Sequence, residues 1–365
     1  MDIEKLLKRM AELDASDLHL KAGRKPFFRI KTVLKEVSDV EVLSPEEIEE
    51  YAFSIMNDKQ KAIFMEQMEM DLATEKPDVG RFRVNIFRQR GNVGIVMRRI
   101  KSVIPSFEEL GLPPVLSKIS DFSTGLVLVA GPTGCGKSTT LAAMIEYINQ
   151  SRSAMHIVTI EDPIEYVYTD KNCLINQREV GLDTLSFHDA LKRVLREDPD
   201  IILIGELRDV ETFEAAIRAC ETGHLVFSTL HTVDTVTTIN RVLDFFPQQQ
   251  HDMIRKTLAY NLRATCCQKL LPKKDGTGMV PACEIMIVTP IISRLIIEDK
   301  IGKIPSAIAA DKETGMQSFN QHLVQLINND IITKETGFEA SPAPHALEMN
   351  LRGIYLDEET RIIGD

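Results

Sequence analysis

A glycine-rich segment between an apolar run and a helical stretch limits most strongly what this chain can fold into. The segment GPTGCGKST spans residues 131–139, and the apolar run LVLVA directly precedes it at residues 126–130. A GxxxxGK[ST] pattern that follows a buried strand and opens a helix is typical of a phosphate-binding P-loop. The position of this motif therefore predicts an α/β core that binds a nucleotide.

The residue types of the motif each supply a different contact to phosphate groups. Gly131, Gly134 and Gly136 allow backbone N–H groups to turn inward, with the positive end of the following helix behind them. Lys137 is expected to neutralise the β- and γ-phosphates, and the hydroxyl of Ser138 to bind Mg²⁺, so a magnesium nucleotide is the implied cofactor. The predicted cofactor-binding residues are Gly131, Pro132, Thr133, Gly134, Cys135, Gly136, Lys137, Ser138 and Thr139.

Short continuous apolar runs recur after the P-loop, at residues 157–160, 201–204 and 225–227. Strands that are buried on both faces of a parallel sheet have this pattern, and stretches long enough for helices separate the runs. We therefore expect an α/β fold in which helices cover a parallel sheet.

The two ends of the chain differ from this core. Alternating stretches such as residues 81–87 predict a small α+β domain, and a Pro- and Gly-bearing segment at residues 101–114 interrupts the periodicity as a linker does. Beyond Pro272 the pattern becomes mainly helical, and it weakens after Ile332. We expect an α+β domain at 1–100, a linker at 101–116, an α/β domain at 117–332 with helices from about residue 272, and a polar tail of unknown role at 333–365.

Composition excludes several classes of protein. A hydrophobic content of 44% and a charged content of 27% are ordinary for a soluble globular chain. The net charge of −11 disfavours binding to nucleic-acid phosphates, which usually requires a basic face. No apolar run reaches the ~18 residues of a membrane helix, because polar residues interrupt the most apolar stretch, residues 285–297.

The amino terminus and the cysteines indicate a cytoplasmic protein. Residues 1–17 alternate acids and bases on a helical period and lack the apolar core of a secretory signal. The six cysteines form no CxxC pair, so the sequence supports neither a zinc ribbon nor a secreted disulfide framework.

Acidic residues follow two of the apolar runs. Glu161 and Asp162 end the run HIVTI, and Glu206 follows the run DIILIG. Acids at the carboxyl ends of neighbouring strands can orient a water and hold a metal, although ordinary turn acids occur at the same places. We assign Glu161 to the attacking water and Glu206 to the magnesium ion, and the two roles could be exchanged. Nearby acids are expected to support these groups or to cap helices: Asp162, Glu165 and Asp209.

Two histidines flank another buried run in TGHLVFSTLHT. His224 precedes this run and His231 follows it, so one or both could donate to the γ-phosphate and report its loss. Structural histidines with satisfied hydrogen bonds would fit the same bare pattern. Neither their spacing nor the cysteines indicate zinc.

Arginines cluster in the first domain of this otherwise acidic chain. Three interpretations compete: a solvated strand face, a nucleic-acid patch, or arginine fingers that offset charge during phosphoryl transfer. Few aromatic residues accompany the arginines, which disfavours a nucleic-acid patch, and the P-loop favours the fingers. The cluster contains Arg81, Arg83, Arg88, Arg90, Arg98 and Arg99.

Seven motifs follow one another along the chain: GRFRVN, GPTGCGKST, TIEDPIEY, REVGLDTLSF, LREDPDIILIGELRD, ETGHLVFSTLHT and TINRVLDFFP. In this order they resemble the motifs of the type IV pilus retraction ATPases, the PilT/PilU group of the type II/IV secretion ATPase superfamily. The resemblance implies a PAS-like amino-terminal domain, a RecA-like ATPase domain, and a homohexamer or a hexamer mixed with a paralogue. It also implies ATP as the nucleotide.

The resemblance further implies roles for individual residues and for partners. The family's catalytic positions correspond to Glu161 in the Asp box, Glu206 in the Walker B motif, His224 and His231 in the His box, and Arg83 and Arg98 among the arginines of the first domain. The ring would lie on the cytoplasmic side of the inner membrane under the pilus platform protein. ATP hydrolysis there would drive pilin depolymerisation and twitching motility, without a direct nucleic-acid partner.

One departure leaves the branch of this family open. PilT members carry an AIRNLI signature where this chain reads IISRLI, residues 291–296, so retraction alone and an accessory PilU-like role are both compatible with the sequence. A secretion or extension ATPase would be expected to add an amino-terminal domain and a tetracysteine insertion, and the sequence shows neither. A nucleic-acid translocase and a non-hydrolysing scaffold subunit are more remote alternatives.

Overall fold

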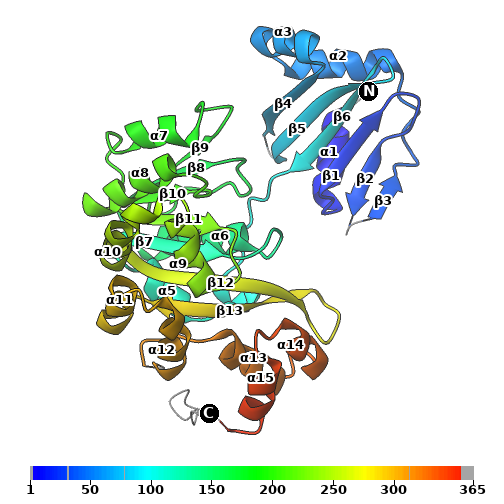
Figure 1. Ribbon diagram of the computed structural model, residues 1–365. Coiled ribbons are helices and arrows are strands. Elements are labelled where there is room, and N and C mark those ends of the chain that lie inside the picture. The colour runs from blue at the N-terminus through cyan, green and yellow to red at the C-terminus, as the bar shows by residue number, and fades with distance from the viewer. Residues whose placement is uncertain (1–2, 31–32, 78, 312, 355–365) are drawn as a thin grey trace. The chain divides into compact units, whose positions relative to one another are not determined.

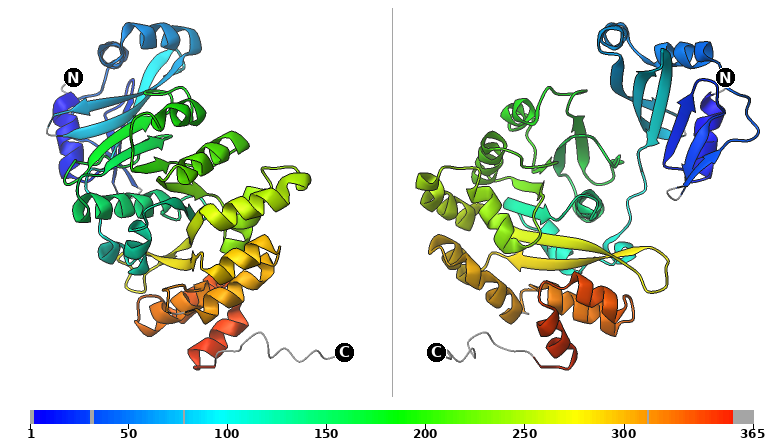
Figure 2. Two further views of the ribbon diagram at one scale, coloured as in Figure 1. Left: turned by 90° about the vertical axis from the view of Figure 1, so that its left-hand side faces the viewer. Right: turned by 45° about the vertical axis from the view of Figure 1, so that its right-hand side comes forward.

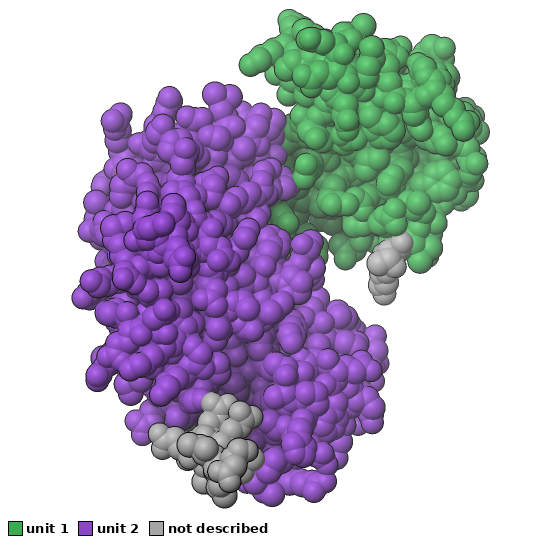
Figure 3. Space-filling view, in the orientation of Figure 1, with its two compact units in different colours: residues 1–103, 164–167 green, residues 104–163, 168–365 purple. Residues whose placement is uncertain are grey.

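The computed structural model describes residues 3–30, 33–77, 79–311 and 313–354, which form two compact units (Figures 1 and 3). Unit 1 comprises Met1–Val103 and Ile164–Val167, and unit 2 comprises Ile104–Pro163 and Tyr168–Asp365. The short segment joins unit 1 through a parallel bridge and the hydrogen bond that the N–H of Val167 donates to the carbonyl of Lys101.

Unit 1 is an antiparallel six-stranded sheet with three helices. The strand order is β3-β2-β1-β6-β5-β4. Its strands are β1 (Asp17–Lys21), β2 (Phe27–Ile30), β3 (Val33–Glu36), β4 (Glu69–Lys76), β5 (Gly80–Gln89) and β6 (Asn92–Arg99). Its helices are α1 (Ile3–Glu12), α2 (Pro45–Ile55) and α3 (Asp58–Gln67).

Period-two patterning gives this sheet one apolar face. On β5 the side chains of Phe82, Val84 and Ile86 are buried, and the residues between them are partly exposed. Capping boxes start α2 at Ser44 and α3 at Asn57, which fixes where the chain turns into these helices. The α+β organisation expected for the first domain is therefore confirmed.

Unit 2 is built on a seven-stranded sheet of the order β13-β12-β7-β11-β10-β8-β9. All neighbouring strands pair in parallel except β13, which is antiparallel to β12. The strands are β7 (Gly125–Ala130), β8 (His156–Glu161), β9 (Leu174–Glu179), β10 (Ile201–Ile204), β11 (Leu225–Leu230), β12 (Leu262–Pro272) and β13 (Met279–Ile287).

Helices and short 3₁₀ turns complete unit 2 (Figure 2). The helices are α4 (Phe107–Leu110), α5 (Val115–Ser120), α6 (Lys137–Ser151), α7 (Phe187–Val194), α8 (Val210–Glu221), α9 (Thr235–Leu243), α10 (His251–Asn261), α11 (Pro290–Ile297), α12 (Ile304–Ala310), α13 (Phe319–Asn328), α14 (Lys334–Ala340) and α15 (Pro344–Leu351). The 3₁₀ turns are η1 (Gln248–Gln250) and η2 (Ile301–Lys303).

The central strands of unit 2 are buried on both faces, as their apolar runs predicted. Leu126 and Leu128 of β7 belong to one hydrophobic cluster, and Val127 and Val129 to another. Successive side chains of a strand point to opposite faces, so the two clusters are the cores on the two sides of the sheet. The predicted α/β core is confirmed.

The carboxyl-terminal third of the chain differs from the expectation. We expected helices from about residue 272, but the strand β13 lies there and forms the edge of the sheet. A proline and an acid, Pro281 and Glu284, interrupt its apolar pattern, and an edge strand tolerates proline. Residues 333–365 were expected to be a polar tail, and no secondary structure was assigned to them. The helices α14 and α15 form there and Leu347 is fully buried, whereas residues 355–365 lie outside the described residues.

Part of the expected linker belongs to the core of unit 2. From Ile104 onward the segment lies in this unit, and Leu112 and Leu116 pack in the same hydrophobic cluster as Val127. Across the described residues, none of the helices is both long enough and apolar enough to span a bilayer.

Candidate functional site

The P-loop follows β7 and ends at the first turn of α6. Gly131 adopts a φ of 151° and Gly136, the residue that caps α6, a φ of 92°, both in the region that favours glycine. A Cβ on Gly131 would lie 2.4 Å from the Sγ of Cys135 and 2.5 Å from the backbone oxygen of Gln268. The loop therefore requires glycine at its first position because other chain segments pack against it.

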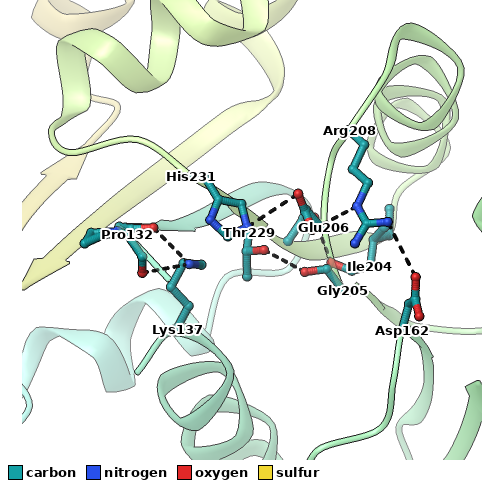
Figure 4. Close-up of polar contacts among 11 residues, drawn as sticks. Pro132, Lys137, Asp162, Ile204, Gly205, Glu206, Arg208, Thr229 and His231 are labelled. Atoms are coloured by element: carbon teal, nitrogen blue, oxygen red, sulfur yellow. Dashed lines mark hydrogen bonds and ion pairs between the residues drawn. The ribbon is translucent and has the colours of Figure 1, made fainter. Parts of the chain in front are cut away.

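Lys137 is held at the start of α6, with its side chain folded onto the loop. Its Nζ donates to the carbonyl oxygens of Gly131 at 2.9 Å and Pro132 at 3.1 Å (Figure 4). The residue is 8% exposed. The ammonium group thus lies within the P-loop beside the helix N-terminus, where phosphate binding requires a positive charge.

The carboxyl ends of four parallel strands meet at the same edge of the sheet, because β7, β11, β10 and β8 are neighbours. Three hydrogen bonds join these ends to one another. Thr229 Oγ1 donates to the carbonyl of Gly205 at 2.7 Å, and the N–H of Gly205 donates to Ile160 at 2.8 Å. The N–H of Gly131 donates to Leu230 at 3.2 Å. The P-loop and the two acidic strand ends are therefore parts of one connected edge.

Glu206 lies at this edge between a histidine and an arginine (Figure 4). Its Oε1 lies 3.5 Å from the Nε2 of His231, and its Oε2 accepts a hydrogen bond of 3.0 Å from the Nε of Arg208. Arg208 also reaches Asp162, with 3.5 Å between Nη1 and Oδ2. The structure thus brings Glu206 and His231 together and adds Arg208 as a link to the acidic end of β8.

Glu161 ends β8 and is partly buried. Its Oε1 accepts a 2.6 Å hydrogen bond from the hydroxyl of Thr159 and a 3.2 Å bond from the amide of Gln177. These bonds orient the carboxylate from its own strand and from β9. Asp209, expected to support the site or to cap a helix, caps the N-terminus of α8 by accepting from the N–H of Thr212.

The structure does not bring His224 to this edge. His224 precedes β11, whereas the P-loop and Glu206 follow the carboxyl ends of their strands. Its Nδ1 lies 2.9 Å from the carbonyl of Ala219 and 3.0 Å from the hydroxyl of Thr222 at the end of α8. In this unit His224 therefore contacts the end of a helix, and its predicted catalytic role stays a proposal.

The two predicted arginine fingers lie in unit 1 as cross-strand partners. Arg83 on β5 stands opposite Arg98 on β6. The side chain of Arg98 is 69% exposed, and its Nε donates at 2.8 Å to Asp17, whose side chain is only 4% exposed. Arg29 approaches the second oxygen of Asp17 at 3.7 Å. A buried carboxylate thus holds Arg98 at one nitrogen while the rest of that side chain stays accessible.

Three residues that the sequence reasoning missed contact the candidate groups: Arg208, Gln268 and Asp17. Arg208 follows Glu206 by two positions in GELRD, so its proximity was available as a signal. Gln268 and Asp17 carried no signal, because only strand pairing brings them to the P-loop and to Arg98. Burial raises the pKa of the Cys135 thiol, so this P-loop residue is a neutral thiol at pH 7.

The residues present fit a magnesium ion. The hydroxyl of Ser138 belongs to the second residue of α6, next to Lys137, and Glu206 offers a carboxylate at the same edge of the sheet. Both are hard oxygen donors, and Mg²⁺ typically takes one or two protein oxygens and completes its shell with phosphate oxygens and water.

Comparison with known proteins gives the family. The type II/IV secretion system protein family matches residues 1–312. The chain belongs to this family. It is 48% identical over 344 residues to the type IV pilus retraction ATPase PilT of Pseudomonas aeruginosa, covering 94% of this chain and 99% of PilT. It is 41% identical over 352 residues to the type IV pilus ATPase PilU of the same organism, covering 96% and 92%.

A solved structure of this family resembles the fold over nearly its full length. A crystal structure of the pilus retraction motor PilT with bound ADP matches with a TM-score of 0.88 and 46% identity, covering 95% of this chain and 99% of that one. The family and the two-part fold predicted from the seven motifs are therefore confirmed.

Proposed function

We propose that this chain is an ATP-hydrolysing motor subunit that drives type IV pilus retraction. The observation that carries the proposal is the edge of unit 2, where the P-loop with Lys137 and the Glu206–His231 pair lie together in a chain 48% identical to a retraction ATPase. Nucleotide binding follows from the P-loop and from the ADP held by the PilT structure.

The chain's own residues divide the work of hydrolysis. The P-loop N–H groups and Lys137 bind and orient the phosphates, which supplies most of the electrostatic stabilisation in phosphoryl transfer. Glu161, oriented by Thr159 and Gln177, holds the attacking water and receives its proton. His231, 3.5 Å from Glu206, responds to the γ-phosphate and its loss.

Magnesium completes the site in this proposal. Ser138 and Glu206 would hold the ion, which, when bound, offsets the negative charge that the phosphate oxygens carry during transfer. The exchange of roles between Glu161 and Glu206 stays open. Arg83 and Arg98 are proposed to offset charge at a nucleotide as arginine fingers.

The assembly and its location extend the proposal. We infer a hexamer of this chain, or one mixed with a paralogue, that works in the cytoplasm at the inner membrane against the pilus platform protein. Support comes from the similarity to PilT and PilU along nearly the whole chain. The higher identity to PilT favours retraction by this chain, whereas the IISRLI sequence of α11 departs from the AIRNLI signature of PilT.

The test measures ATP hydrolysis and particle mass on the same samples. Wild type, Glu206→Ala, Arg98→Ala and an equimolar mixture of the two variants are compared. We expect a hexamer in which each variant is inactive and in which the mixture regains part of the activity, because some sites then combine an intact Glu206 with an intact Arg98. The matched control is Arg90→Ala, an exposed arginine in the β5–β6 turn, which should hydrolyse ATP like wild type.

A monomeric wild type, or an Arg98→Ala variant as active as wild type, would overturn the finger assignment. Stimulation of hydrolysis by DNA or RNA would instead support the translocase alternative. In a twitching bacterium whose own retraction ATPase has been deleted, expression of this chain should restore motility. If motility returns only when a second retraction ATPase is also present, the chain is an accessory subunit.

A further inference from the structure

We propose that Gln268 is a positioning residue that sets the orientation of the P-loop peptide between Cys135 and Gly136. The inference rests on the proposed function of this loop as the nucleotide site. Gln268 lies on β12, the neighbour of the P-loop strand β7, and no motif of the sequence analysis included it. The residue is 1% exposed.

In the described part of the chain, the side chain of Gln268 hydrogen-bonds to the P-loop and to the helix that follows it. Its Nε2 donates to the carbonyl oxygen of Cys135 at 2.6 Å, and its Oε1 accepts from the hydroxyl of Thr140 at 2.9 Å. The amide group is thus held on both sides. Because an unsatisfied polar group in such a buried place is costly, each partner keeps the other in position.

The orientation of one peptide group links these contacts to phosphate binding. In a planar trans peptide the C=O and the following N–H point in opposite directions. Gln268 holds the carbonyl of Cys135 on the β12 side of the loop, so the N–H of Gly136 points away from β12. A P-loop binds phosphate with backbone N–H groups of this region. Gln268 therefore aims an N–H donor without touching the nucleotide.

Two glycines confirm how closely β12 approaches the loop. A Cβ on Gly131 would meet the backbone oxygen of Gln268 at 2.5 Å, and a Cβ on Gly136 would meet its Nε2 at 3.2 Å. The backbone of Gln268 thus packs at the first glycine of the loop and its side chain at the last. One residue of the neighbouring strand therefore contacts the loop at both of these glycines.

The test separates the contribution of the hydrogen bond that Gln268 donates from that of the hydrogen bond it accepts. Gln268→Met keeps length and apolar burial but removes both hydrogen bonds, and Gln268→Glu keeps an acceptor for Thr140 but turns a second oxygen toward the carbonyl of Cys135. Thr140→Val removes only the helix-side bond. Affinity is measured with a fluorescent ADP analogue, and kcat and KM for ATP with the intact assembly.

We expect Gln268→Met and Gln268→Glu to weaken ADP binding by about tenfold or more, because the carbonyl of Cys135 then loses its hydrogen-bond donor. Thr140→Val should weaken ADP binding by about threefold, because the Gln268 amide keeps this hydrogen bond but is held less firmly. The KM for ATP should rise by more than kcat falls. If Gln268 had only a structural role, its substitution would lower the melting temperature of the nucleotide-free protein but leave the Kd of the folded fraction for ADP unchanged.

Unchanged ADP affinity in folded Gln268→Met or Gln268→Glu would overturn the inference. If neither variant folds, Thr140→Val decides by the same measurement, since an ADP affinity equal to wild type would also overturn it. Failure of the proposed function is recognised separately. A wild type that binds ADP but does not hydrolyse ATP would refute the motor proposal and leave the Gln268 measurement valid.

Discussion

Replacing Arg208 by alanine separates stability from catalysis at the edge of the sheet. Arg208 contacts Glu206 through Nε at 3.0 Å and Asp162 through Nη1 at 3.5 Å, and its side chain is 54% exposed. The Glu206 contact raises the pKa of Arg208, so the guanidinium carries a full charge at every usable pH. In Arg208→Ala, Glu206 loses the side chain that holds its Oε2.

The cost to stability should be small. Exposed ion pairs contribute about 0.2–1 kcal/mol each and are screened by salt, so the two pairs together stabilise unit 2 by about 2 kcal/mol at most. For a domain of this size that corresponds to a shift in melting temperature of roughly 8 °C or less, at about 2–4 °C for each kcal/mol. The cost to catalysis should be larger, about tenfold or more in kcat, because a misplacement of about 1 Å in a catalytic group can cost as much as a hundredfold.

The assay combines thermal unfolding, ADP affinity and steady-state hydrolysis. The ADP affinity of Arg208→Ala should stay within about threefold of wild type, since Lys137 and the backbone N–H groups of the P-loop are untouched. Arg218→Ala is the matched control, because Arg218 on α8 contacts only the backbone of its own helix among the contacts described. A kcat equal to wild type would refute the claim that Arg208 positions Glu206. A large fall in melting temperature would refute the claim that these exposed ion pairs contribute little to stability.

Four further substitutions test other parts of the structure. Gly131→Ala should abolish ADP binding in the fluorescence assay, because its Cβ would lie 2.4 Å from a buried sulfur atom. Asp17→Asn should lower ATP hydrolysis in the intact assembly, because Arg98 loses the charged partner that holds its Nε. Leu347→Ala should lower the free energy of unfolding by about 2–5 kcal/mol in chemical denaturation, as for other fully buried leucines. Burial raises the pKa of Glu284 above its ordinary value of 4.5, so the folded protein binds this proton more tightly than the unfolded chain does. The stability of the protein should therefore fall as the pH rises from 4.5 through the raised pKa. Glu284→Gln should remove this loss in melting curves taken across that pH range.

The buried strands of unit 2 were predictable because each is a continuous apolar run. The strands β12 and β13 were not, because functional and polar residues interrupt them. Gln268 lies in β12 to brace the P-loop, and Glu284 lies in β13 to accept from the N–H of Thr235. Only the paired partners of these residues make them compatible with a buried strand, and those partners are far away in the sequence.

The helices after residue 332 escaped prediction for a different physical reason. Gly337 lies inside α14, where glycine normally disfavours a helix. A Cβ at this position would lie 2.5 Å from the Cδ1 of Ile327 on α13, so the absent side chain permits the two helices to pack closely. Tertiary packing therefore stabilises a helix that local propensity argues against.

The candidate site shows which kind of sequence argument transfers to three dimensions. Residues after the ends of parallel strands were expected to meet, and Glu206 and His231 do so. His224 and His231 were grouped because they flank one strand, but a six-residue strand separates its ends by about 20 Å. In a parallel sheet only the carboxyl ends converge on the P-loop. Within this unit, the direction of the strand therefore decides which of two flanking residues lies beside the P-loop, and the predicted role of His224 stays a proposal.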